Sequence, residues 1–225
     1  MKKYLTNSNT FLWQKTKRKF FWVIGLGLLF FIGSFTIKNT EKETALQDGD
    51  IIFQTSESAQ CEAIRIATKS NYSHCGIIFI EKGKIYVYEA VQPVKVTLFE
   101  HWIKNGKNNS YIVKRLKNSK TVLTSSTISE MKKYAKKDLN KHYDLYFEWS
   151  NDKIYCSELV WKIYKNGANI EICKLQKLKD FDLNHPKVKA ILKERYGNKI
   201  PLDEAVVAPS QLVESQLLQT VIDTY

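Results

Sequence analysis

The sequence predicts an α+β fold, in which strands and helices gather in different parts of the chain. Most strand-like patterns lie before residue 117, whereas the longer helical patterns follow residue 125. A doubly wound parallel sheet would instead alternate strand and helix along the chain. A hairpin signal between two of the strand patterns favours antiparallel pairing. We therefore expect an antiparallel sheet packed against helices.

Four short segments carry the strand patterns. Each combines apolar, β-branched or aromatic residues with turn residues at its ends. The turn Glu81-Lys82-Gly83-Lys84 joins the second and third segments as a tight hairpin. The four predicted strands are 51–53, 73–80, 84–91 and 111–116.

Apolar residues at helical spacing predict five helices. The third of them opens at Cys156 and carries a wide apolar stripe, so it should be buried. Gly167 is expected to end it, because glycine is the commonest residue just past a helix. The five predicted helices are 57–69, 126–139, 156–166, 186–196 and 209–216.

The N-terminus predicts a membrane anchor. Residues 20–37 form an uninterrupted uncharged run of 18 residues, just long enough to span a bilayer as a helix. Basic residues precede the run, which favours a cytoplasmic segment 1–19 and export of the rest. A polar linker, 38–45, would then lead to one domain, 46–225. A signal peptide cleaved to release a secreted protein is the alternative, but the preceding segment is long and no Ala-x-Ala site follows.

Charge and cysteine content exclude several classes. The formal net charge is +12, but seven basic residues precede Glu41, which leaves about +5 for the remainder. The lysines of that remainder are scattered, without a nucleic-acid motif, so no nucleic-acid partner is expected. The four cysteines form no Cys-x-x-Cys pair, so we expect no metal, and no organic cofactor is implied.

The hairpin brings a histidine and a carboxylate together. With Lys82-Gly83 at its tip, paired residue numbers sum to 165, so His74 faces residue 91. Glu89 then lies diagonally from His74 on the same face, within reach of a long side chain. Cys75 points to the opposite face and should be a small buried residue.

Cys156 is the candidate nucleophile. A thiol at a helix N-terminus feels the positive end of the helix dipole, which lowers its pKa. Free amides there could also receive an oxyanion. Together with His74 as base and Glu89 as orienting group, it completes the set for cysteine catalysis. Four other residues could support the site or bind substrate, although turn, capping or core roles are the simpler interpretation: Asp50, Ser73, Tyr155 and Glu158.

Five segments, in this order, resemble the YiiX/YaeF-like permuted papain-like amidases, relatives of the NlpC-type cell-wall peptidases. They are 49–53, 73–77, 88–90, 143–144 and 155–160. The resemblance implies a circularly permuted papain-like core with Cys156 as nucleophile, His74 as base and Glu89 as third residue. Cys75 departs from the pattern, where a small aliphatic residue such as valine is expected.

The expected function is that of a membrane-anchored cysteine amidase or peptidase acting outside the cytoplasm through an acyl-enzyme. The resemblance suggests peptide amide bonds of peptidoglycan as substrate. Alternatives are a lipid acyl hydrolase or acyltransferase using the same triad, and a non-catalytic binding module on the same scaffold. A sortase-like transpeptidase is disfavoured, because Cys156 opens a helix and only Arg195 follows it. The sequence leaves open hydrolysis or acyl transfer, and the oligomeric state.

Overall fold

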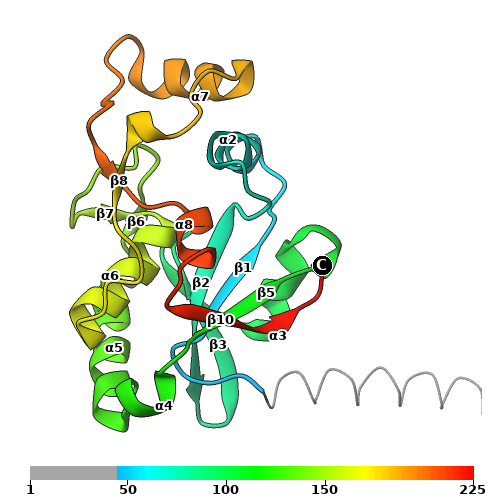
Figure 1. The fold of residues 1–225 in the computed structure, drawn as a ribbon, viewed down its shortest axis with the longest axis vertical. Coiled ribbons are helices and arrows are strands. Elements are labelled where there is room, and N and C mark those ends of the chain that lie inside the picture. Colours follow the sequence, from blue (N-terminus) through cyan, green and yellow to red (C-terminus); the bar gives the residue numbers. More distant parts are fainter. Residues whose placement is uncertain (1–44) are drawn as a thin grey trace, which may run out of the picture. The chain divides into compact units, whose positions relative to one another are not determined.

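A six-stranded antiparallel sheet forms the centre of the protein (Figure 1). The structure, a computed structural model, describes residues 45–225. The strand order across the sheet is β10-β5-β1-β2-β3-β4, and every neighbouring pair is antiparallel. Its strands are β1 (Ile51–Gln54), β2 (His74–Glu81), β3 (Lys84–Glu89), β4 (Lys95–Leu98), β5 (Ile112–Leu116) and β10 (Leu218–Asp223).

The two faces of the sheet bury different side chains, as the period of two along a strand requires. Phe53 and Ile77 belong to the core on one face, whereas Ile52 and Ile78 belong to a second core on the other. Because both faces are covered, β1 is buried along its whole length. This explains why it appears in the sequence as a continuous apolar run.

The hairpin register predicted from the sequence is confirmed. Glu81 pairs with Lys84 and Ile77 with Tyr88, so paired numbers sum to 165. Lys82 and Gly83 at the tip both have positive φ, which fits a tight two-residue turn.

Two long helices, α5 (Ser125–Lys137) and α6 (Cys156–Ala168), pack side by side along the first core (Figure 1). The prediction that Gly167 ends α6 is wrong. The helix continues through Gly167 to Ala168, and Asn169, which has a left-handed φ of 54°, caps it. Gly167 serves packing instead, because a Cβ there would lie 2.6 Å from the Cα of Met131 in α5.

A separate helical layer lies at one end of the sheet (Figure 1). It consists of α2 (Ala59–Thr68) and α7 (Pro186–Tyr196), which share a small apolar cluster around Ala63, Val188 and Leu192. Ser58 caps α2 by accepting a hydrogen bond from the Cys61 amide, 3.1 Å away. The bounds of α7 agree with the prediction, since Pro186 begins it and Gly197 follows it.

The remaining elements are short, and most were not predicted. They are the helices α3 (Phe99–Trp102), α4 (Ser119–Val122) and α8 (Pro209–Val213), the strand pairs β6 (His142–Tyr143) with β7 (Lys153–Ile154) and β8 (Gln176–Lys177) with β9 (Ala205–Val206), and the 3₁₀ turns Ile103–Asn105, Lys107–Asn109 and Leu178–Asp180. The antiparallel six-stranded sheet and the helices packed against it confirm the predicted α+β class.

The predicted anchor, 20–37, and its flanking segments 1–19 and 38–44 lie outside the described residues. Within residues 45–225, no helix combines the length and the apolar character needed to cross a bilayer.

Candidate active site

Cys156 is the first residue of α6 and is only 3% exposed. Tyr155 before it is extended, with φ −103° and ψ 168°, so the helix starts abruptly at the thiol. The Tyr155 amide donates to the Glu158 carboxylate, 3.2 Å away, and this contact fixes the first turn. The thiol therefore lies at the end of the helix where the amides are unpaired and the dipole is positive.

His74 opens β2, and Glu89 closes β3. Their side chains meet with His74 Nε2 2.7 Å from Glu89 Oε2, the diagonal contact that the hairpin register predicts. Both residues are buried. Since Nε2 is engaged by the carboxylate, Nδ1 is the ring nitrogen left for the thiol.

Two further side chains hold Glu89 in place. Trp102 Nε1 donates to Glu89 Oε2 over 2.9 Å, and Thr97 Oγ1 donates to Oε1 over 2.6 Å. The Trp102 ring also stacks against His74, with ring centres 5.8 Å apart. Both carboxylate oxygens and one face of the imidazole are thus fixed from β4 and α3.

Sequence reasoning missed Thr97 and Trp102. The sequence contained a signal for Thr97. Lys95 pairs with Glu89, and Thr97 lies two residues after Lys95, so its side chain is on the same face of the sheet as Glu89. Reading it required recognising β4, whose four residues follow an irregular stretch containing Pro93.

The electrostatics of the three residues favour a charged pair. Burial opposes protonation of His74, but hydrogen bonds to Cys156 and Glu89 raise the pKa of the imidazole to about 10. Hydrogen bonds with Cys75 and His74 outweigh burial and hold the pKa of the Cys156 thiol well below its usual range. Burial would raise the pKa of Glu89, yet its hydrogen bond with His74 keeps it lowered. The arrangement supports a thiolate, an imidazolium and a carboxylate in one row.

Cys75 lies in the first core, on the α6 side of the sheet, and is fully buried. This agrees with the expectation that it points away from the face of His74. Its thiol nevertheless interacts with Cys156, and burial raises the pKa of Cys75, so it stays a neutral donor to the thiolate. The sequence did not indicate this contact, because it depends on where α6 begins against β2.

Two of the four candidate supporting residues, Asp50 and Ser73, make structural contacts away from the pocket. Asp50 forms a bidentate pair with Arg115, with both contacts at 2.7 Å, and caps the Gln47 amide. Burial raises the pKa of Asp50 despite this partner. Ser73 accepts a hydrogen bond from the Ser56 amide. The structure places neither of them along the pocket that contains Cys156.

The other two candidates lie at the start of α6. Tyr155 lines the pocket and accepts a hydrogen bond from the Val207 amide through its hydroxyl. Glu158 is fully buried in the first turn and lies 2.7 Å from Lys162. Burial raises the pKa of Glu158 to about 7. Both support the start of α6, and only Tyr155 can contact a ligand in the pocket.

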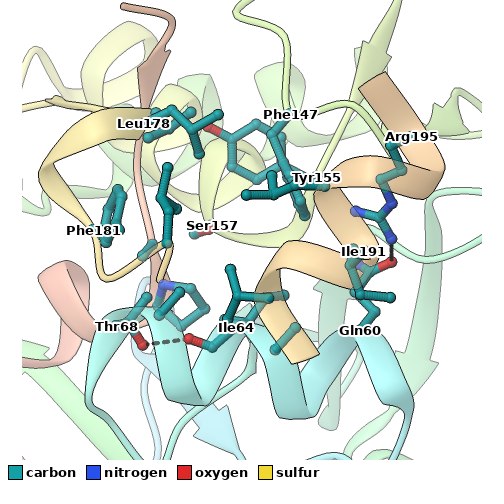
Figure 2. Close-up of a pocket in the computed structure, with 18 of the residues that line it drawn as sticks. Gln60, Ile64, Thr68, Phe147, Tyr155, Ser157, Leu178, Phe181, Ile191 and Arg195 are labelled. Atoms are coloured by element: carbon teal, nitrogen blue, oxygen red, sulfur yellow. Dashed lines mark hydrogen bonds between the residues drawn. The ribbon is translucent and has the colours of Figure 1, made fainter. Parts of the chain in front are cut away.

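The pocket beside Cys156 is apolar. It has an empty volume of about 780 Å³, part of it open to solvent, and lies between α2, α7 and the start of α6. Ile64 and Ile191 project into it from two of these helices, and Leu178 and Phe181 close one end (Figure 2). Such a lining suits the aliphatic or aromatic part of a ligand.

A short chain of polar side chains crosses the opposite end. Arg195 Nη2 donates to Gln60 Oε1 over 2.6 Å, and Gln60 Nε2 donates to the Tyr143 hydroxyl over 3.0 Å. Burial raises the pKa of Tyr143 well above its usual value, so it remains a neutral phenol close to Cys156. These residues were not among the predicted site residues.

The profile of a family described as "permuted papain-like amidase enzyme, YaeF/YiiX, C92 family" matches residues 45–222. The curated protein YiiX of Escherichia coli strain K12, described as uncharacterized, is 46% identical over 175 residues, 78% of this chain and 85% of that protein. A crystal structure of YiiX from Escherichia coli O157:H7 superposes with a TM-score of 0.76 at 45% identity, covering 80% of this chain and 98% of the other.

That crystal structure is described as one of a metalloprotein. Within residues 45–225 of the present chain, no group of three or more histidine, cysteine, aspartate or glutamate side chains is arranged to hold a metal ion. The described residues therefore do not fit a protein-built metal site, and the chemistry below uses side chains alone.

Proposed function

Because the chain belongs to the YaeF/YiiX family of permuted papain-like amidases, we propose that it is a cysteine hydrolase that cleaves an amide bond with Cys156, His74 and Glu89. The observation that carries the proposal is the 2.7 Å contact between His74 and Glu89 next to a thiol at a helix start. Nucleophile, proton carrier and orienting group are then all within one buried cluster.

The reaction follows from the charges of the three groups. The Cys156 thiolate attacks the amide carbonyl carbon and forms a carbon–sulfur bond. Protonated His74 gives its proton to the nitrogen as the carbon–nitrogen bond breaks and the amine leaves. Water then attacks the thioester, with His74 as base, and releases the acid and the thiolate. Glu89 keeps the imidazole oriented throughout.

The oxyanion formed in each attack needs donors. The unpaired amides at the start of α6, next to the Cys156 thiol, can supply them. The Tyr143 hydroxyl is a second candidate, because its oxygen already accepts from Gln60 and its own proton is free to be donated. A neutral phenol is required for this, and the raised pKa of Tyr143 maintains it.

For substrate and location we propose peptide amide bonds of the cell wall, met outside the cytoplasm. The support is the resemblance to cell-wall peptidases and the uncharged run 20–37 with basic residues before it. In this proposal the run anchors the protein in the membrane and the remainder is exported. Cleavage of the run as a signal would instead release a secreted enzyme.

The apolar pocket favours a second candidate, an enzyme acting on acyl groups with the same three residues. Its lining is almost entirely apolar and it reaches Cys156, so an aliphatic acyl group could occupy it during the attack. The two candidates share the acyl-enzyme and differ in what fills the pocket.

Alkylation of the full-length chain by iodoacetamide tests the proposal. We expect Cys156 to react near neutral pH, well below the pKa of about 8.5 of a free thiol, and to lose this reactivity in His74→Ala. Cys173→Ala is a matched control, because burial raises the pKa of that thiol to about 12 and its removal should change nothing. An unreactive Cys156, or reactivity indifferent to His74, would leave a binding module on a papain-like scaffold.

A further inference from the structure

Within residues 45–225, Arg195 is the only cationic side chain among those that line the pocket. It projects from α7, on the side opposite Leu178 and Phe181 (Figure 2). The residue is partly buried, and an anionic ligand would stabilise a cation held among aliphatic and aromatic side chains.

The structure gives the guanidinium group two partners, and neither is charged. One nitrogen donates to Gln60 over 2.6 Å, and the group lies 5.4 Å from the centre of the Phe147 ring. In the described part of the chain no carboxylate forms an ion pair with it. An arginine has five N–H donors, so most of them remain for a ligand.

The cation lines the same pocket as Cys156. Gln60 joins Arg195 to Tyr143, and the Tyr143 phenol interacts electrostatically with both Arg195 and Cys156. A ligand whose carbonyl carbon contacts Cys156 would therefore share the pocket with Arg195, and a polar group near the cleaved amide could turn toward it. The apolar end around Leu178 and Phe181 would receive the more distant part (Figure 2).

We propose that Arg195 binds the α-carboxylate of an N-acyl amino acid, which makes this class of amide the substrate. The apolar acyl group occupies the pocket toward Leu178 and Phe181, and the carboxylate of the departing amino acid pairs with the guanidinium. In such a molecule only the nitrogen and one carbon separate the carboxylate from the cleaved carbonyl. Hydrolysis consumes one water and releases a fatty acid and an amino acid.

This inference rests on the proposed function for turnover, but its recognition step can be measured without turnover. The probes are N-dodecanoylglycine and its neutral counterpart N-dodecanoylglycinamide, which differ only in the terminal group. Calorimetry on the full-length Cys156→Ser variant reports binding alone. We expect the carboxylate to bind about 10- to 100-fold more tightly, as for a hydrogen bond to a charged group.

Arg195→Gln, made in the same background, should abolish that preference by weakening binding of the carboxylate alone. Arg195→Lys should keep part of it, because lysine retains the charge without the two-pronged geometry. The matched control is Lys193→Gln, which removes an exposed cation from the same helix and should leave the preference intact. Equal binding of the two probes, or a preference that survives Arg195→Gln in a folded variant, would overturn the inference.

Turnover separates the two proposals. If wild type hydrolyses N-dodecanoylglycine, Arg195→Gln should raise KM for it about 10- to 100-fold and leave KM for the glycinamide unchanged. An inert Cys156 together with an arginine-dependent preference would reject the enzyme and keep the recognition. A reactive Cys156 that turns over both probes at equal KM would keep the proposed hydrolase and reject recognition of the carboxylate by Arg195.

Discussion

The ring of Trp102 lies against the imidazole of His74, with the two planes inclined by 23°. The same indole donates its N–H to the carboxylate oxygen of Glu89 that His74 contacts. One side chain thus contacts both the imidazole and the carboxylate of the proposed catalytic group, although it is not among the residues that line the pocket.

Replacing Trp102 by Phe should keep the stacked ring and remove the donor to Glu89. Loss of a hydrogen bond to a charged group costs about 1.5–3 kcal/mol, so we expect about 10-fold or greater loss in the alkylation rate of Cys156 at neutral pH. The pH at which the rate is half maximal should also rise. A structural role alone would lower the melting temperature without moving this pH profile.

The charge of Glu89 should set the pH range in which the thiolate–imidazolium pair exists. The pKa of His74 is raised to about 10, and that of Cys156 is lowered, so the pair persists between the two values. Glu89→Gln removes the anion that favours the imidazolium, so the pKa of His74 should fall. The pH range of the charged pair then narrows from its upper end.

Titration of the ultraviolet absorbance of the thiolate, with Cys156→Ser subtracted, measures this range. Lys82→Gln offers a control, since that residue is exposed at the tip of the hairpin and should alter the range little. An unchanged titration in Glu89→Gln would mean that the carboxylate does not act on the pair.

Gly167→Ala should destabilise the protein, although alanine is ordinarily the better helix residue by about 1 kcal/mol. The added Cβ would lie 2.6 Å from Met131 Cα, which is backbone and cannot rotate away. Forcing α5 and α6 apart should cost about 1–3 kcal/mol of unfolding free energy. Denaturant unfolding decides the sign, and a stabilised variant would show that the two helices are not packed as described.

Asp50→Ala should lower the unfolding free energy by about 3–5 kcal/mol, because it leaves the partly buried Arg115 without its bidentate partner. Asp203→Ala is the contrast. That carboxylate is 71% exposed in its pairs with Lys177 and Lys179, so its loss should not measurably change stability. If the two substitutions lowered the unfolding free energy by similar amounts, the buried pair of Asp50 with Arg115 would not be more stabilising than the exposed pairs of Asp203.

The hairpin could be predicted in detail because its information is local. The two-residue turn Lys82-Gly83 sets the register of the hairpin, and the period of two along each strand then determines which side chains share a face. The diagonal contact of His74 with Glu89 followed from numbering alone, and the structure contains it. The start of α6 at Cys156 was likewise indicated by a single apolar stripe.

What could not be predicted depends on how separate elements meet. Gly167 was interpreted as a helix end because sequence does not reveal that Met131 crosses at that point. Trp102 and Arg195 approach the site from α3 and α7, elements that the core motifs do not include. Their roles emerge only when the sheet edge and the helical layer are placed around the thiol.

The order of the three residues along the chain has a consequence for synthesis. His74 and Glu89 are 15 residues apart, so the loop that joins them closes at small entropic cost while the rest of the chain is still being made. Cys156 comes much later and gains its partners only when α6 docks on the strands that precede it. Until then the thiol lacks the contact with His74, so the reactive pair that we propose forms only at a late step of folding.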